Sequence, residues 1–421
     1  MRKTRGGTAG IVAGVMLGMM AGGAGAADAP AAPKTADSAM EAITGGKLIF
    51  NLRPRYEYFD QDGKTEVGNA FTNRTLFGWE TLPYHGFSLR FEGINVARIG
   101  EQHYIDVPTA QTRYPTIADP EDTDVNQLYV DYTGIPDTKI RAGRMALKLD
   151  NVRFIGNVEF RQVMQVFNGA LIENRSLPNV ELQLAHFQRV KNIYAIQRQT
   201  HVEIARAAWT FKPENQLVAY GYFQDQPNTG QVTGLADNSN RILGLRANGA
   251  WPLSGAYKLP YTAEYAKQDK YADGDAKIDA SYWRLGAGVQ RDKTFIRFDH
   301  EHLGSNNGLY AFQTPLGTNH LFQGWVDLFL VTPVQGIRDS YVSAGTMLWG
   351  VQLYTELHDL RSAVGNLHYG KEWDIGITKA FTKQLTGKME YGAFREDDVL
   401  TPASARKRDS TKFWLTMIYN Y

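Results

Sequence analysis

Apolar and polar residues alternate along most of the chain. In residues 47–59, Leu48 and Phe50 share one face of an extended strand, whereas Arg53 and Arg55 share the opposite face. A period of two residues predicts β-strands with one apolar and one polar face. Similar segments recur further along the sequence, at residues 87–92, 349–356 and 372–378.

The alternation extends over about eighteen segments, and the connections between them alternate in length. Short connections, rich in the turn-forming residues Pro, Gly, Asn and Asp, lie at residues 82–86, 134–137, 176–179, 212–215, 250–255, 291–293 and 382–384. Long polar connections lie at residues 97–124, 148–166, 188–200, 224–239, 267–279, 303–336, 359–367 and 395–409. Outer-membrane barrels have this arrangement, with short periplasmic turns, long extracellular loops and an even number of strands.

We therefore predict an all-β fold, a transmembrane antiparallel up-and-down β-barrel of about 18 strands that covers residues 46–421. No segment after the N-terminal region approaches the ~20 consecutive apolar residues of a membrane helix. The apolar faces should contact lipid, because an Arg or Lys at mid-depth on that side costs roughly 2–4 kcal/mol. The charged faces then line a lumen of roughly 18 Å backbone radius, which side chains alone do not fill.

The N-terminus predicts export. Three basic residues among the first five precede an apolar core at residues 11–20, and an A-x-A cleavage motif ends at Ala26. Residues 1–26 are thus expected to be a signal peptide, and residues 27–45 a flexible periplasmic leader. The absence of cysteine agrees with passage through an oxidising periplasm, and it excludes disulfides and thiolate chemistry. We expect the protein in the outer membrane of a Gram-negative cell, surrounded by lipid.

Charge and the C-terminus refine this prediction. The formal net charge of +1 falls to −2 when the three N-terminal basic residues are removed, which argues against a nucleic-acid partner. The last predicted strand ends on the aromatic Tyr421. Such an ending resembles the signal read by barrel-insertion machinery, which we expect as a partner; the alternative is an ordinary closing strand.

Two loop segments resemble the alginate export family of outer-membrane barrels. Residues 143–157 read GRMALKLDNVRFIGN and continue to Phe160-Arg161-Gln162, with Met145 where the family usually has glutamine and Phe160 where it has tryptophan. The second segment reads FQTPL at residues 312–316 and continues through residues 324–333. The resemblance spans the barrel and implies a channel for passive passage of an anionic polysaccharide or its fragments. A general or substrate-selective porin for small solutes is the alternative.

Arginines are the candidate solute-path residues, because guanidinium groups pair bidentately with carboxylates. The candidates on predicted lumen faces are Arg53, Arg55, Arg74, Arg90, Arg141, Arg284 and Arg297. A second reading is that they pair with neighbouring carboxylates and brace the wall. The predicted constriction-loop motif consists of Arg144, Asp150, Asn151, Arg153 and Arg161, in a loop expected to fold inward.

The remaining motifs indicate no chemistry of their own. The hydrophobic residues within 303–336 predict a short amphipathic helix packed on the barrel. The acidic residues at 119–124 suit a solvated loop better than a calcium site, and His300 and His302 lack a convincing third ligand. No G-x-S-x-G motif occurs, so we predict that the protein is not an enzyme; a barrel hydrolase is the remote alternative. We also predict no cofactor and no bound metal.

Overall fold

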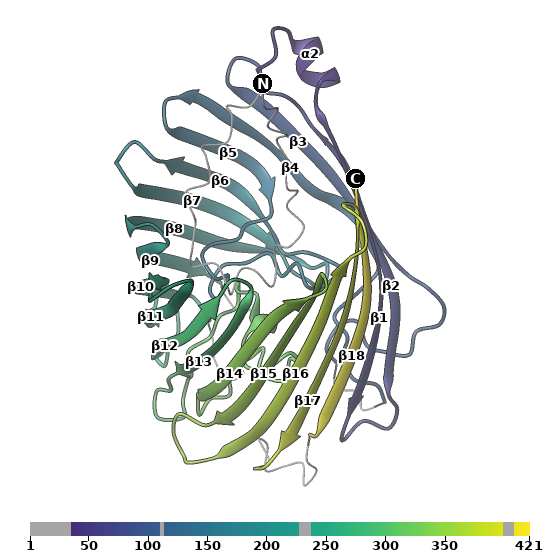
Figure 1. Ribbon diagram of the computed structural model, residues 1–421, viewed down its shortest axis with the longest axis vertical. Helices are drawn as coiled ribbons and strands as arrows, with labels where there is room; N and C mark the ends of the chain where they lie inside the picture. Colours follow the sequence, from purple (N-terminus) through teal and green to yellow (C-terminus); the bar gives the residue numbers. More distant parts are fainter. Residues whose placement is uncertain (1–34, 110–112, 227–236, 399–407) are drawn as a thin grey trace.

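The structure, a computed structural model, describes residues 35–109, 113–226, 237–398 and 408–421. Eighteen strands within these residues form one closed antiparallel sheet, in which each strand pairs with its neighbours in sequence and β1 pairs with β18 (Figure 1). The all-β barrel predicted from the alternating pattern is confirmed. The strands are β1 (Lys47–Gln61), β2 (Gly68–Glu80), β3 (Phe87–Arg98), β4 (Asp122–Ile135), β5 (Thr138–Met145), β6 (Val166–Asn174), β7 (Val180–Lys191), β8 (Gln197–Lys212), β9 (Asn215–Asp225), β10 (Asn240–Pro252), β11 (Tyr257–Lys270), β12 (Asp279–Arg291), β13 (Thr294–Leu303), β14 (Ile337–Leu348), β15 (Val351–Arg361), β16 (His368–Ala380), β17 (Leu385–Glu396) and β18 (Ser410–Asn420).

The barrel wall has its apolar side chains outside and its charged side chains inside. On β13, Ile296 and Phe298 are 57% and 54% exposed, whereas Asp299 and Glu301 are fully buried. On β1, the charged Arg53 faces inward in the same way. A soluble protein would aggregate through so large an apolar surface, whereas a lipid bilayer covers it.

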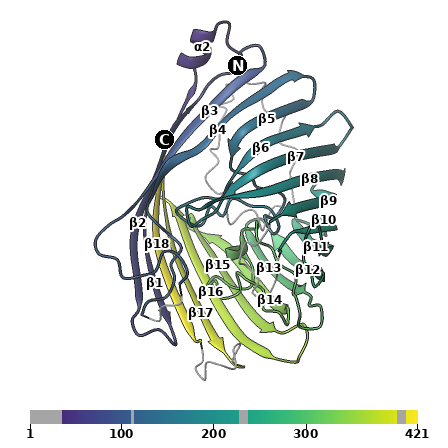
Figure 2. The same cartoon turned by 180° about the vertical axis from the view of Figure 1, so that it is seen from behind.

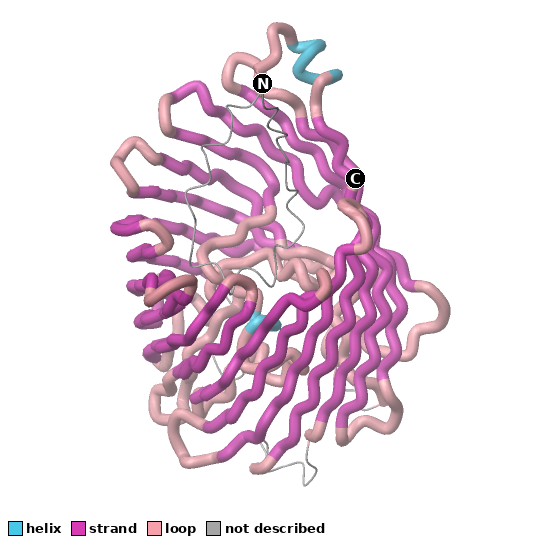
Figure 3. Tube along the Cα trace, viewed as in Figure 1, coloured by secondary structure: helices cyan, strands magenta, loops and turns pink. Residues whose placement is uncertain are grey.

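Connections of different length gather at opposite ends of the barrel. Turns of two residues lie at one end, for example at 136–137, 213–214 and 292–293. The longest connections, residues 99–121, 146–165 and 304–336, start from the other end. Figure 3 shows that loop segments enter the ring of strands at mid-height.

Three sequence expectations need correction. The connections predicted at 188–200 and 267–279 are shorter, because β7, β8 and β11 continue through polar residues and leave only 192–196 and 271–278 outside the strands. Trp349, which the alternation places on a strand, is the first residue of a two-residue turn and is 93% exposed. Polarity alone therefore overestimates loop length, and hydrophobicity alone extends a strand into a turn.

The third correction concerns residues 303–336. This segment has no α-helix; it contains only the 3₁₀ turn η1 (Asn319–Leu321). Its apolar residues Phe322, Trp325 and Phe329 are buried inside the barrel, so burial within the lumen replaces the predicted helical face.

A short helix, α2 (Ala39–Thr44), packs at the short-turn end beside β2 (Figure 2). Trp79 donates a hydrogen bond from its indole nitrogen to the carbonyl of Ile43, and Leu82 donates its backbone N–H to Ala42. The expected signal peptide lies outside the described residues, as does most of the expected leader. In the part of the chain that the structure describes, neither helix is long and apolar enough to cross a membrane.

Candidate functional site

Two loops occupy the lumen and define the candidate site. We call residues 146–165, between β5 and β6, the first inserted loop, and residues 304–336, between β13 and β14, the second inserted loop. The first contains the family-like segment 146–157 with Phe160-Arg161-Gln162, and the second contains residues 312–316 and 324–333. Because they start from separate hairpins, each must be held by its own contacts with the wall.

The first inserted loop crosses the barrel from one side to the other. Near its start, Asp150 accepts hydrogen bonds from Arg206 on β8 (2.7 Å) and Arg246 on β10 (2.6 Å). Near its end, the Gln162 side chain accepts a hydrogen bond from Arg53 on β1 (3.0 Å) and donates one to Thr72 on β2 (2.9 Å). In a closed ring of eighteen strands, β1 and β10 are nine strands apart in either direction and therefore lie opposite each other.

Guanidinium groups on β1 form the dock for the end of this loop. Arg53 donates hydrogen bonds to the backbone carbonyls of Glu159 (2.7 Å) and Arg161 (2.5 Å). Arg55 donates one to the carbonyl of Phe160 (2.5 Å) and also pairs with Asp119 from the β3–β4 connection. We call Arg53 and Arg55 the basic dock. Its planar forks satisfy several carbonyls of an irregular buried loop, groups that would otherwise lack partners.

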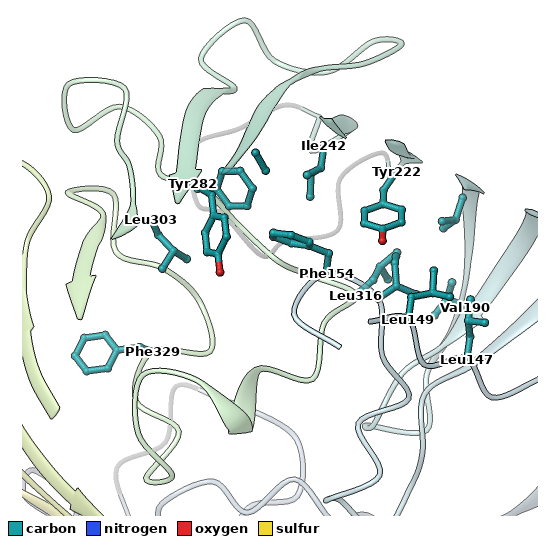
Figure 4. Packing of buried hydrophobic residues seen from close by; sticks show 14 of the residues in the cluster. Leu147, Leu149, Phe154, Val190, Tyr222, Ile242, Tyr282, Leu303, Leu316 and Phe329 are labelled. Atoms are coloured by element: carbon teal, nitrogen blue, oxygen red, sulfur yellow. The ribbon is translucent and has the colours of Figure 1, made fainter. Parts of the chain in front are cut away.

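Apolar packing holds the middle of the first inserted loop. Leu149 and Phe154 belong to a buried cluster with Tyr222 on β9 and Ile242 on β10 (Figure 4). The ring of Phe154 lies 6.2 Å from that of Tyr222, between centroids. Leu316 of the second inserted loop joins the same cluster. The lumen thus contains a hydrophobic core where the two loops and the wall meet.

The second inserted loop is docked by carboxylates rather than by guanidinium groups. Val326 donates its backbone N–H to Glu372 on β16 (2.7 Å). Trp325 donates its backbone N–H to Asp374 (3.4 Å) and its indole N–H to Glu356 on β15 (3.2 Å). We call Glu356, Glu372 and Asp374 the acidic dock. Each is at most 2% exposed.

A glycine allows the second inserted loop to lie this close to the acidic dock. Gly324 has a φ of +85°, a conformation that strains residues with a side chain. A Cβ atom there would also collide with the carboxylate of Glu372. Gly324 therefore lets the loop turn directly above the acidic dock.

The two inserted loops are joined by buried ion pairs. Arg161 lies between Glu57 on β1 (2.9 Å) and Asp327 of the second inserted loop (2.6 Å), and Lys412 on β18 also contacts Asp327 (3.0 Å). Burial alone would raise the pKa of Asp327, but Lys412, His320 and Arg161 outweigh it and hold this pKa well below its usual range. The contact therefore stays charged at neutral pH.

A second connection passes through Arg153. Its guanidinium lies 2.8 Å from Glu301 on β13 and donates a hydrogen bond to Gln323 of the second inserted loop (2.9 Å). Asn151 has a local role instead, because its side chain accepts the backbone N–H of Arg153 (3.2 Å). Arg144, at the end of β5, pairs with Asp124 (2.9 Å).

The other predicted lumen arginines each have a partner on the wall. Arg74 donates a hydrogen bond to Asn51 (2.9 Å) and is buried. The ion pairs of the remaining four are Arg90 with Glu80 and Glu92, Arg141 with Asp131, and both Arg284 and Arg297 with Asp299. Arg90 and Arg141 keep partly exposed side chains, 23% and 19%. Most of the candidates thus brace the wall or hold a loop.

Sequence reasoning missed several side chains that hold the inserted loops, including the carboxylates of the acidic dock. Arg206 and Arg246 hold the start of the first inserted loop, and Lys412 contacts the second. All three stand at alternating positions of predicted strands, so the two-residue period could have marked them as inward-facing. Their loop partners lie far away in sequence, which no local pattern reveals. The acidic 119–124 segment is paired with cations as well, through Arg55, Arg144 and Lys191.

Comparisons with known proteins agree with this architecture. The family model described as alginate export matches residues 49–319. The barrel is similar to Pseudomonas aeruginosa OccK5 (OpdH), with 12% identity over 89% of this chain and 98% of that one at a TM-score of 0.64. It is also similar to Pseudomonas aeruginosa OpdK with vanillate, with 13% identity over 89% of this chain and 99% of that one at a TM-score of 0.65. For Acinetobacter baumannii OccAB1 the identity is 14% over 92% of this chain and 99% of that one, at a TM-score of 0.66. At such identities the likeness shows a shared fold. A sequence comparison with curated proteins finds no match.

Proposed function

Because this chain belongs to the alginate export family, we propose that its outer-membrane channel passes small acidic solutes, such as sugar acids and short uronate fragments, by passive diffusion. The barrel supplies a polar lumen through the membrane, and its inserted loops supply the selection. Diffusion needs no energy source, and the direction follows the solute gradient.

The observation that carries this proposal is the first inserted loop. It is tied to β1 at one end and to β10 at the other, so it divides the lumen across its width. A solute passes beside this loop, through a smaller opening than a barrel of roughly 18 Å backbone radius would otherwise offer. Small solutes fit such a path better than a wide polymer does.

The preference for acids rests on cations that remain partly exposed beside the loop. Lys148 on the first inserted loop is 47% exposed, and Arg90 and Arg141 line the wall toward the short-turn end. Carboxylate partners hold each of them without covering it, which leaves N–H groups able to bind a passing carboxylate weakly. Weak binding at several sites favours entry while still permitting release. The structure of the similar OpdK was determined with vanillate, a small organic anion.

Planar-bilayer recordings and liposome swelling test this function. Purified protein should give stepwise conductance, a reversal potential on the anion side in a KCl gradient, and faster uptake of galacturonate than of neutral sugars of similar size. The double variant Arg90→Gln/Arg141→Gln should reduce both preferences, whereas Arg175→Gln in an exposed turn should not. Absence of conductance at every voltage, or faster entry of neutral sugars in the native protein, would refute the proposal.

A second candidate is export of an intact acidic polysaccharide, which the family description favours. It requires the first inserted loop to leave the lumen, because the loop's two anchors lie on opposite walls. Long uronate chains should then block or pass the channel at lower concentration than dimers do. Equal or weaker action of the long chains favours small solutes.

A further inference from the structure

Beneath the second inserted loop lies a cluster of buried ionisable side chains. Asp339 on β14, Glu356 and His358 on β15, and Glu372 and Asp374 on β16 come from three adjacent strands (Figure 1), and none is more than 4% exposed. Four carboxylates and one imidazole give a formal charge between −4 and −3. No arginine or lysine of the described chain forms an ion pair with them, whereas Glu301 nearby has Arg153. Buried charges without compensation are costly, so the cluster needs protons or a cation.

The imidazole is oriented as metal ligands are. Its Nδ1 atom lies 2.9 Å from the carboxylate of Asp339, which can only accept, so Nδ1 carries the hydrogen. The second ring nitrogen, Nε2, is buried and has no hydrogen-bond partner among the described residues. A carboxylate behind one nitrogen and a free second nitrogen form the arrangement that fixes histidine ligands at metal sites.

The distances around Nε2 fit a metal polyhedron better than hydrogen bonds. Nε2 lies 3.5 Å from Oε2 of Glu356 and 3.7 Å from Oδ2 of Asp374. Bonds of about 2.0–2.1 Å to tetrahedral zinc imply ligand-to-ligand separations of about 3.3–3.4 Å. One donor atom from each of the three residues lies within 4.8 Å of the others. Glu372 Oε2 and Asp374 Oδ1 are buried oxygens that also lack a hydrogen-bond partner in the described chain.

We propose that Glu356, His358 and Asp374 bind a divalent transition-metal cation, Zn²⁺ in particular. One imidazole nitrogen with carboxylate oxygens suits zinc, whereas calcium and magnesium prefer oxygen ligands alone. Glu372, two residues from Asp374 on β16, adds a further buried carboxylate whose Oε2 lacks a hydrogen-bond partner in the described chain. The cation offsets charge that the wall does not otherwise compensate.

The same site holds the second inserted loop. Trp325 donates to both proposed carboxylate ligands, from its backbone N–H to Asp374 and from its indole to Glu356. These N–H groups act as outer partners that orient metal ligands. Metal binding therefore favours the docked loop, and chelation should make it more mobile.

Metal analysis of the folded barrel in detergent tests the site. After equilibration with micromolar ZnCl₂ and gel filtration, we expect one zinc per barrel. His358→Gln and Asp374→Asn should weaken zinc binding at least tenfold, and Asp339→Asn should weaken it about 10–100-fold through loss of the outer partner. The matched control His300→Gln removes an imidazole that stacks on Trp283, on the opposite face of the wall from Asp339, and it should bind zinc as the native protein does.

Two results would overturn this site. One is stoichiometric zinc that survives both His358→Gln and Asp374→Asn, which places the metal elsewhere. The other is no zinc retained by the native barrel, which means that protons neutralise the carboxylates. If the variants do not fold, zinc-edge X-ray absorption of the native protein decides: one imidazole with oxygen ligands at about 2.0–2.1 Å supports the site, and two or more imidazoles refute it.

Discussion

The two inserted loops are held in the same lumen by opposite chemistry. The first offers backbone carbonyls to the guanidinium groups of Arg53 and Arg55, whereas the second offers N–H groups to Glu372 and Asp374. An irregular loop has backbone N–H and C=O groups that lack partners within the loop. The wall supplies donors where a loop presents carbonyls and acceptors where a loop presents N–H groups. Buried wall charges here therefore serve first as loop docks.

The docks differ in how their charge is balanced. The basic dock is balanced in part, because Arg55 pairs with Asp119 and Glu57, whereas Arg53 donates its hydrogen bonds to neutral groups. The acidic dock contains three carboxylates, and among the described residues His358 is the one basic side chain that forms ion pairs with them. Loss of a charge should therefore have unequal consequences on the two sides.

The largest expected effect follows from breaking the contact between the loops. Arg161→Gln leaves Glu57 and Asp327 with less compensation inside the lumen, and loss of one member of a buried pair costs about 3–5 kcal/mol. Urea unfolding of the detergent-solubilised barrel, followed by tryptophan fluorescence, measures the change. The control Arg175→Gln removes a 66% exposed partner of Glu181 and should cost about 0–1 kcal/mol. Equal losses for the two variants would contradict a buried link.

The next effect separates the docks directly. Arg53→Lys keeps the charge but loses the fork that binds two carbonyls and Gln162, and we expect a loss of about 1–3 kcal/mol. Glu372→Gln keeps an oxygen that can accept from Val326 and removes one uncompensated charge, so its cost should lie near zero. The same unfolding assay compares them. A greater loss of stability for Glu372→Gln than for Arg53→Lys would contradict an excess of negative charge at the acidic dock.

Acid should loosen the inserted loops without unfolding the barrel wall. We expect this effect to be smaller than those of the substitutions above. Around Asp119 and Asp150, burial raises the pKa, but arginines outweigh it and hold both values below the ordinary carboxyl range. The stabilisation they give is therefore full above the unfolded pKa of about 3.9 and is lost as pH falls further through the folded value. Single-channel current should stay quiet from pH 8 to 5 and become noisy only below about pH 4. Noise that begins near pH 6 would argue against carboxylate anchors.

The smallest effect concerns the partly exposed pair of Lys148 and Glu159. Lys148→Gln should change stability by about 0–1 kcal/mol, because solvent screens the 47% exposed Lys148 and because Arg53 and Arg74 remain near Glu159. It should still move the reversal potential slightly toward cations, since Lys148 faces the water beside the first inserted loop. A large loss of stability, measured by urea unfolding, would show that this pair anchors the loop.

The sequence predicted the wall far better than the lumen. The two-residue period of segments such as 47–59 depends only on neighbours along the strand, so it predicted the sheet and the inward face of Arg53. The contacts of Arg206 and Arg246 with Asp150 depend on ring closure, which joins residues from separate hairpins. The hydrophobic residues around Trp325 suggested a helix because periodicity does not distinguish a helical face from a buried irregular loop.

Conductance of a barrel that lacks most of the first inserted loop shows whether this loop is the constriction. A variant in which a short Gly-Ser linker replaces residues 150–162 keeps the wall, and its folding can be checked by heat-modifiable gel mobility. If this loop is the constriction, single-channel conductance should rise roughly threefold or more, and discrimination between galacturonate and neutral sugars should fall. A folded variant with native conductance would contradict this, because the loop would then not limit passage.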